Sequence, residues 1–455
     1  MKVVLISTYE LGRQPFGLAS PAAWLRERGH HVKCLDLSRQ SLDEVAVSEA
    51  SLIAFYVPMH TATRLTLELI PPLRRLNPNA NFCAYGLYAP LAAQSFRRLG
   101  VTSLFGGEFE QSLVDLVEYR SPSSLSPEIP PPDSTISLTR LHFLTPDRGD
   151  LPQLHCYAHL ILPSGQHRTV GYTEASRGCK HFCRHCPIVP VYNGVFRIVD
   201  REVVLSDVRQ QVAAGAEHVT FGDPDFFNGV GHAIPLVEAL RREFPQLTYD
   251  VTIKVEHLLK HRELLPKLRE TGCLFVVTAV ESLDDSILEK LQKGHTRADF
   301  FRVVELFRQA GLGLQPTFVP FTPWTTFDIY LDLLEQLRRL DLVAAVPPIQ
   351  LAIRLLIPPA SRLLELQDVK QIVGPFDPVT LVYPWKSVDS ALDELATELQ
   401  DIVSSSEKVK RPRSATFELI RRAANLTASR AIPEISVPVL ASHPPPPYLN
   451  EPWYC

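Results

Sequence analysis

The sequence predicts an α/β protein: a doubly wound parallel sheet, then a partial (β/α)6 TIM-type barrel, then an irregular proline-rich tail. Apolar runs of strand length alternate with helical patterns over residues 1–120 and again from His167 onward. A proline- and serine-rich stretch separates the two series, and a second one closes the chain. These observations divide the chain into regions 1–120, 121–165, 166–360 and 361–455.

Length and composition bound the class of protein. The 455 residues suggest roughly three folding units. With 45% hydrophobic and 21% charged residues, the chain suits a soluble globular protein, and its net charge of -4 supplies no basic field for nucleic acid or an anionic membrane. No apolar run reaches membrane-spanning length and the N-terminus lacks a signal-peptide core, so we expect a cytoplasmic protein whose cysteines stay reduced.

The first region predicts a Rossmann-like unit. Its expected strands share short apolar runs and lie at 2–7, 30–37, 51–58, 81–87 and 101–108. Helical patterns cover 20–29 and 61–76, the second broken by Pro71 and Pro72. Region 121–165 starts with an extended proline/serine linker and continues as a connecting segment of unassigned structure.

The second region predicts the barrel. Its six expected strands lie at 167–176, 217–223, 247–253, 273–281, 312–319 and 349–356, and the helices between them include 203–214, 233–244, 263–271, 286–292 and 327–340. Beyond residue 360 a helix is expected over 390–404, followed by an extended tail. Active sites of such folds lie at the C-terminal ends of the strands.

Eight cysteines fall into three groups. Four are isolated among apolar or mixed neighbours and are expected to be small buried hydrophobes: Cys34, Cys83, Cys156 and Cys273. Three others, Cys179, Cys183 and Cys186, fall within eight residues after the first barrel strand, and Cys455 ends the chain.

The run S-R-G-C-K-H-F-C-R-H-C-P has the spacing Cys-x3-Cys-x2-Cys. Three thiolates so close together can wrap one soft metal centre, and the spacing favours an iron–sulfur cluster. Zinc held by the three cysteines with His181 or His185 is the alternative. A cluster with three protein ligands keeps one iron open to a chelating substrate or cofactor.

This motif, placed after the first strand of a β/α series, resembles the signature of the radical S-adenosylmethionine (SAM) superfamily. The resemblance implies a [4Fe-4S] cluster on Cys179, Cys183 and Cys186, SAM at the open iron, and reductive cleavage of SAM. An external one-electron reductant such as a flavodoxin or ferredoxin is implied as partner.

The resemblance also implies SAM-contacting residues near the cluster. Family members usually carry an aromatic residue before the third cysteine; here His185 stands there, while Phe182 precedes the second. The family's Gly-Gly-Glu stretch corresponds to Gly222 and Asp223, with Asp225 close by. A strand-closing Asp-Pro turn is the alternative.

Two later strands complete the implied site. The stretch A-V-E-S-L-D-D resembles the family's Gly-x-Glu-Ser, which places Glu281 and Ser282 against SAM; the alternative is an ordinary helix start capped by Ser282. Arg354, inside an apolar run, is either an exterior residue or a functional one that meets a carboxylate or phosphate.

The first region resembles the cobalamin-binding domain that precedes many radical SAM domains, on the stretches L-I-S-T-Y-E-L-G and G-V-T-S-L-F-G-G-E-F-E. The Asp-x-His-x-x-Gly pattern of some cobalamin proteins is absent. Bound cobalamin and a degenerate domain kept for packing or substrate binding both remain open.

The tail, which ends P-Y-L-N-E-P-W-Y-C, resembles a subfamily of radical SAM proteins named for a Cys-Sec-Ala-Glu-Pro or Cys-Cys-Ala-Glu-Pro tail. Cys455 would then be the first residue of that motif and a catalytic thiol, and the next codon a UGA for selenocysteine. A thiol–selenol pair would be a soft, redox-active ligand for a thiophilic metalloid substrate.

Together these observations favour a radical SAM enzyme that methylates, or transfers another SAM-derived group to, a small molecule, without nucleic acid or membrane as partner. The alternative from a different class is a zinc-stabilised binding or sensor protein with a Rossmann-like domain.

Overall fold

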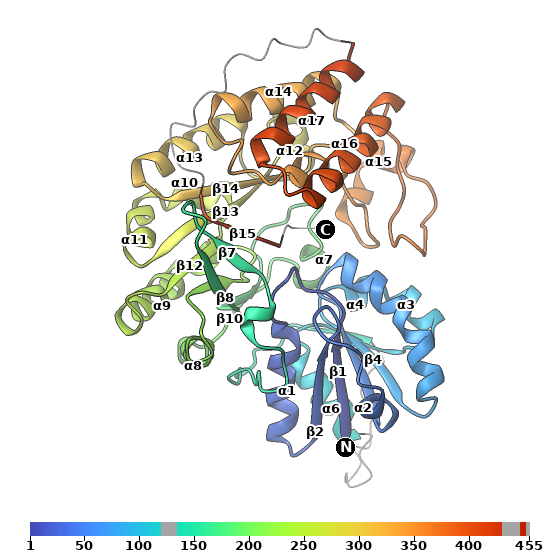
Figure 1. Ribbon diagram of the computed structural model, residues 1–455. Helices are drawn as coiled ribbons and strands as arrows, with labels where there is room; N and C mark the ends of the chain where they lie inside the picture. The colour runs from blue at the N-terminus through green and yellow to red at the C-terminus, as the bar shows by residue number, and fades with distance from the viewer. Residues whose placement is uncertain (120–133, 430–445, 452–455) are drawn as a thin grey trace.

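A computed structural model describes residues 1–119, 134–429 and 446–451. Figure 1 shows two α/β bodies, with the N-terminal unit in blue and the barrel-type unit in green to orange. The expected linker over 121–135 falls almost wholly, and the terminal Cys455 wholly, outside the described residues. Among the described residues no helix is long and apolar enough to cross a membrane.

The N-terminal sheet is parallel throughout and runs in the order β2-β1-β3-β4-β5-β6. Its strands are β1 Lys2–Ser7, β2 His31–Asp36, β3 Leu52–Tyr56, β4 Asn81–Tyr85, β5 Ser103–Gly107 and β6 Ser134–Ser137. The five strands expected from the sequence are confirmed. β6 comes from the segment left unassigned and adds a sixth strand beside β5.

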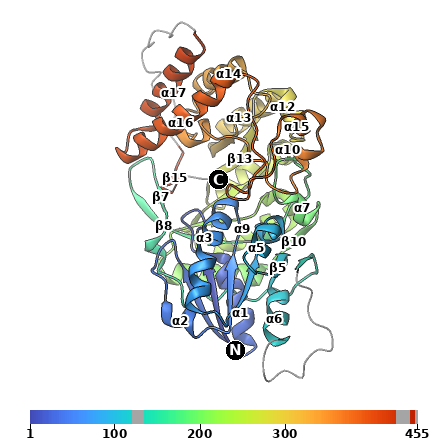
Figure 2. The same ribbon diagram turned by 90° about the vertical axis from the view of Figure 1, so that its right-hand side faces the viewer.

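Helices cover both faces of this sheet. They are α1 Phe16–Glu27, α2 Glu44–Ser48, α3 His60–Leu76, α4 Tyr88–Leu91, α5 Ala93–Arg98 and α6 Glu110–Tyr119. Figure 2 shows the unit edge-on, with α3 and α6 on opposite sides of the strands. Two apolar clusters fill the layers, one under α1 and α6 and the other under α3, α4 and α5.

The expected break of α3 at Pro71 and Pro72 is wrong, because the helix runs through both prolines. Ile70 and Leu73 are buried against the sheet, whereas Pro72 lies on the exposed face. The carbonyl groups that lose their helical donors therefore lie toward solvent, and burial of the apolar face holds the helix together.

The second sheet has the order β14-β13-β12-β11-β8-β7-β15. Its parallel strands are β8 His167–Thr173, β11 His218–Phe221, β12 Thr248–Thr252, β13 Cys273–Glu281 and β14 Gly313–Phe318, and antiparallel β7 His159–Ile161 and β15 Tyr448–Leu449 extend the edge. Strands β9 Ser176–Gly178 and β10 Phe196–Ile198 form a separate two-stranded sheet. The result is a curled half-barrel.

The sixth expected strand, 349–356, is wrong. A short 3-10 helix occupies Pro348–Leu351, and only an isolated bridge joins Phe321 to Arg354. Pro347 and Pro348 offer no backbone N–H, so a ladder cannot start there. Five parallel strands and this bridge make up the half-barrel.

Most helices of this unit pack on the outer face of the half-barrel (Figure 1). They are α8 Arg201–Ala213, α9 Val230–Glu243, α10 Val255–Lys260, α11 Leu265–Glu270, α13 Arg297–Ala310, α14 Phe327–Arg339, α16 Ser390–Lys408 and α17 Arg413–Thr427. The short helix α7 Val189–Tyr192 packs against the core of the N-terminal unit, and α12 Asp285–Lys290 and α15 Gln367–Ile372 share a separate apolar cluster. The helix expected at 390–404 is confirmed as part of α16. In the described part of the tail, β15 is extended and pairs with β7.

Three of the four cysteines expected in the core are buried, but Cys156 is exposed. Cys156 ends a 3-10 turn over Leu154–Cys156 at the surface, and Leu154 takes the buried position of that turn. A short turn buries one side chain and leaves its neighbours in solvent. The apolar and polar neighbours of Cys156 in the sequence therefore did not predict whether its thiol is buried.

Candidate active site

The three clustered cysteines lie on one loop at the C-terminal end of the parallel strands. β8 ends at Thr173, β9 ends at Gly178, and Cys179 follows directly. Gly178 has φ +72, and a Cβ there would lie 2.3 Å from the Val195 carbonyl oxygen. Only glycine fits this close turn, which sets the direction of the cysteine loop.

The loop folds back so that its thiols influence one another. The Cys186 amide donates to the Cys183 carbonyl at 3.1 Å, and Cys183 is buried. Burial, followed by the neighbouring Cys183 and other thiols, raises the pKa of Cys186 to about 12, and burial also raises the pKa of Cys179. Three thiols on one short loop are suited to a soft metal centre, and they fit three ligands of a [4Fe-4S] cluster.

A buried ion pair stands beside the loop. Lys293 Nζ lies 3.2 Å from Glu281 Oε1, and His185 Nε2 lies 3.2 Å from the same oxygen. Burial alone would raise the pKa of Glu281, but Lys293 and His185 lower it to about 2. Burial would lower the pKa of Lys293, but Glu281 and Cys183 raise it. The geometry holds a fixed positive charge next to the thiols.

Glu281 also carries unusual backbone geometry. Its φ is +70, a region in which non-glycine residues are rare, and the β13–β14 register shifts beside it. The bulge and the left-handed residue turn the carboxylate toward His185 and Lys293 at the strand end. Such strain is concentrated at functional sites.

The residues expected after β11 have two different roles in the structure. The Asp223 carboxylate accepts from the Ala175 amide at 3.0 Å and from the Ser176 hydroxyl, so it ties the end of β8 to β11. Burial raises the pKa of Asp223 to about 7 despite these bonds. A Cβ on Gly222 would lie 1.9 Å from the Tyr172 hydroxyl, so only glycine fits.

Ser282 is buried, and its hydroxyl accepts from the Asp284 amide at 3.1 Å. The cap of α12 is Asp284, whose side chain accepts from the Ile287 amide. The alternative in which Ser282 caps the helix therefore does not hold, because the helix starts two residues later.

Two other expected contacts lie at the edges of the site. Phe182 is 46% exposed, with the Arg362 guanidinium 5.9 Å from its ring centroid. Arg354 pairs with Asp393 on α16 and stacks over Trp385 at 4.0 Å. Arg354 lines a separate cavity of about 490 Å³ that also includes His60.

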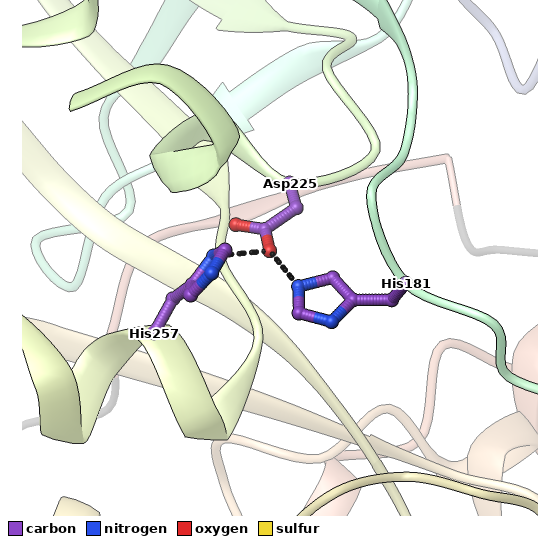
Figure 3. A group of neighbouring side chains, drawn as sticks. All are labelled: His181, Asp225 and His257. Atoms are coloured by element: carbon purple, nitrogen blue, oxygen red, sulfur yellow. Dashed lines mark hydrogen bonds and ion pairs between the residues drawn. The ribbon is translucent and has the colours of Figure 1, made fainter. Parts of the chain in front are cut away.

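Sequence reasoning missed several charged residues here. Lys293 and His295 lie in the stretch L-Q-K-G-H-T, and the structure buries both side chains. Burial, Lys293 and Lys254 lower the pKa of His295 to about 4. A second cluster, His181 with Asp225 and His257, joins three separate segments and left no local signal for His257 (Figure 3).

An ionic cluster lies between the two bodies. Arg177 pairs with Glu110 at 2.7 Å, with Glu174 at 2.8 Å and with Glu108 at 3.3 Å, and all four are nearly or wholly buried. Burial raises the pKa of Glu108 to about 7, although Arg177 opposes it. The cluster borders a cavity of about 180 Å³ at the strand ends of the N-terminal sheet.

Comparison with known proteins assigns the half-barrel. The Radical SAM superfamily matches residues 173–341, which span the cysteine loop and the parallel strands from β11 to β14. Residues 173–341 form a radical SAM domain. Domains of this superfamily work with a [4Fe-4S] cluster and SAM, and the three loop cysteines fit three ligands of the cluster.

Curated relatives are methylating and methylthiolating enzymes. The hopanoid C-3 methylase of Methylococcus capsulatus is 23% identical over 324 residues, covering 68% of this chain and 62% of that protein. A tRNA-2-methylthio-N(6)-dimethylallyladenosine synthase of Geobacter sulfurreducens is 28% identical over 40% of this chain and 43% of its own length. The chain thus spans less than two thirds of either relative.

Solved structures share both bodies. The cobalamin-dependent SAM radical enzyme OxsB with aqua-cobalamin bound aligns with a TM-score of 0.69 at 16% identity, over 94% of this chain and 72% of that chain. The radical SAM methyltransferase TsrM from Kitasatospora setae, with tryptophan and a SAM analogue bound, aligns with a TM-score of 0.58 at 18% identity, over 75% and 72%. At these identities the likeness shows the fold, an N-terminal Rossmann-like sheet joined to a radical SAM domain.

Proposed function

We propose that this radical SAM enzyme transfers a methyl or other SAM-derived group to a small molecule. The observation that carries the proposal is the loop of Cys179, Cys183 and Cys186 at the strand ends, with the buried ion pair of Lys293 and Glu281 beside it. Relatives that methylate or methylthiolate their substrates support this reaction class.

Cys179, Cys183 and Cys186 would hold the cluster, which would supply the electron for reductive cleavage of SAM. The chain's own residues hold the parts in place. The three thiolates fix the cluster, and Lys293 offsets their negative charge from a buried position. Glu281 is ionised beside Lys293 and His185, so it accepts hydrogen bonds from cationic donors, such as the amino group of SAM.

The remaining expected residues take supporting positions in the proposal. Gly222 lets the end of β11 approach Tyr172 closely, and Ser282 and Phe182 are assigned to contacts with SAM. Arg354 already meets a carboxylate, that of Asp393, so we assign it to the shape of the neighbouring cavity.

Cobalamin is the further cofactor that the structural neighbours suggest, since OxsB and TsrM structures contain it. The matching place is the carboxyl edge of the N-terminal sheet, where described residues enclose about 180 Å³. Tyr56, Gly86 and Gly107 line this cavity and would border the cofactor there. No step of the proposal depends on it.

Partners and compartment follow from the chemistry. A flavodoxin or ferredoxin supplies the electron, and these reductants are consistent with a cytoplasmic protein whose cysteines are reduced. The net charge of -4 favours a small molecule over nucleic acid as substrate. Cys455 is proposed to hold the substrate through its sulfur, with a thiophilic metalloid centre as the class to try first.

Anaerobic purification and reconstitution test the proposal. We expect an iron–sulfur absorption spectrum, about four iron and four sulfide per chain, and SAM cleavage with a strong reductant. Cys183→Ala should lose all three, while Cys156→Ala, which removes an exposed thiol outside the loop, should keep them. Zinc without iron after reconstitution, or SAM cleavage by the Cys183→Ala variant, would overturn it.

A further inference from the structure

His181, Asp225 and His257 bring three ligand atoms together beside the cysteine loop (Figure 3). Asp225 Oδ2 lies 3.1 Å from His181 Nε2 and 2.7 Å from His257 Nδ1. The three ligand atoms all lie within 4.8 Å of one another, and the Asp225 side chain is fully buried. The residues come from the cysteine loop, from the turn after β11 and from α10.

The two imidazoles converge on one oxygen, although only His181 Nε2 makes a hydrogen bond to Asp225 Oδ2. Asp225 Oδ1 already accepts from the Phe227 amide at 3.2 Å, so both rings approach Oδ2. The His257 Nδ1 atom is close to Oδ2 but makes no aligned hydrogen bond, and it is a buried nitrogen without a hydrogen-bond partner. Two nitrogens and one carboxylate oxygen pointing to a common centre are typical of a metal site.

The lysines on the same two segments, Lys180 and Lys254, pair with other groups. Lys180 Nζ donates to the Asn228 carbonyl at 2.6 Å, and Lys254 Nζ lies 3.5 Å from Glu256 Oε2. A buried carboxylate between two imidazoles is stabilised when a cation occupies the point between them.

We propose that His181 Nε2, Asp225 Oδ2 and His257 Nδ1 bind one divalent transition-metal ion of the zinc type. Two histidines and a carboxylate form a common three-ligand set, with solvent for the remaining position. The side chains of His181 and His257 are 14% and 11% exposed, which leaves a path for the ion. Glu256 Oε2 lies 3.6 Å from His181 Nδ1, the ring nitrogen that would not bind the ion. In metal sites, a carboxylate at this second nitrogen orients the ligating histidine.

The site would be distinct from the cluster, since none of its ligands is a thiol. His181 lies between Cys179 and Cys183, so an ion there would pin the middle of the cysteine loop to the end of β11 and to α10. Its role would be structural, holding the loop in the shape that presents the thiols. This inference does not rest on the transferred group or on the substrate.

The test uses the full chain with its cluster reconstituted, treated with a chelator, desalted, and supplied with zinc chloride. We expect about one zinc per chain, with an X-ray absorption edge fitted by nitrogen and oxygen ligands and no sulfur near about 2.3 Å. His257→Ala and Asp225→Asn should lose this stoichiometric zinc. The matched control is His261→Ala, one helical turn on, whose ring contacts His257 but is no ligand.

Iron and sulfide counts keep the result interpretable. Variants that retain the wild-type iron and sulfide content have kept the fold and the cluster, so a loss of zinc then reports the site itself. Wild-type protein that binds no stoichiometric zinc, zinc coordinated by sulfur, or full zinc binding by His257→Ala would each overturn the proposal. Failure of SAM cleavage would leave the zinc result unaffected and would count only against the proposed function.

Discussion

Replacing Lys293 by methionine removes the lysine beside Glu281 and leaves that buried carboxylate paired with His185. In the wild type, burial opposes ionisation of Glu281, but Lys293 and His185 lower its pKa from 4.5 to about 2. At about 1.4 kcal/mol per pKa unit, this lowering contributes about 3 kcal/mol to folding at neutral pH. Loss of one partner of a buried pair costs about 3–5 kcal/mol by the same reasoning.

The pH dependence gives the prediction its sign. A carboxyl whose folded pKa is lowered contributes its stability above its unfolded pKa, near 4.5, and loses it as the pH falls toward 2. In the Lys293→Met variant burial dominates, so the folded pKa of Glu281 rises. Its contribution is then present at low pH and lost as the pH increases. The deficit of the variant should therefore grow from about pH 5 to about pH 7.5.

Urea unfolding of the cluster-free chain, followed by tryptophan fluorescence at several pH values, measures this. Lys267→Met is the matched control, because that lysine is exposed and pairs only with surface carboxylates; no measurable change is expected. Adding Glu281→Gln to Lys293→Met should recover part of the loss, since it removes the unpaired charge. A deficit that is small at pH 7, or that does not vary with pH, would refute the reasoning.

Three further outcomes are expected. Cys183→Ala should lose cluster iron and sulfide, while Cys156→Ala, at an exposed thiol, should bind both at wild-type levels, as measured by metal and sulfide analysis. Arg177→Met leaves three buried glutamates without their cation and should lower the free energy of unfolding by at least about 3 kcal/mol, as measured by urea unfolding. The loss should be larger at pH 8 than at pH 6, because protonation of a glutamate such as Glu108 at the lower pH removes its unpaired charge. An equal loss at both pH values would contradict this. Gly107→Ala places a Cβ 2.2 Å from a β6 carbonyl oxygen and should lower the thermal midpoint far more than Gly165→Ala, which has the same sign of φ but open space; equal effects would argue against β6 as part of the first sheet.

The order of helices and strands could be predicted from the sequence because each element has its own local pattern of apolar residues. Apolar runs such as Lys2–Ser7 and Cys273–Glu281 are long, buried and bounded by turn residues, so hydrophobic patterning alone marked them. Errors arose in two ways. Packing overrode a local rule in α3, which continues through Pro71 and Pro72 because its apolar face is buried. A local rule was overlooked at 349–356, which is not a strand because two prolines precede it.

The sequence by itself determined the thiol loop, since the spacing of Cys179, Cys183 and Cys186 within eight residues is a property of the chain alone. Only the tertiary structure decided the charges around it. Lys293 meets Glu281 because the backbone of Glu281 adopts φ +70 at a bulge, and His257 meets Asp225 across two separate β/α units. Such pairings depend on strand register and helix placement, which distant segments set together, so no local pattern of residues encodes them.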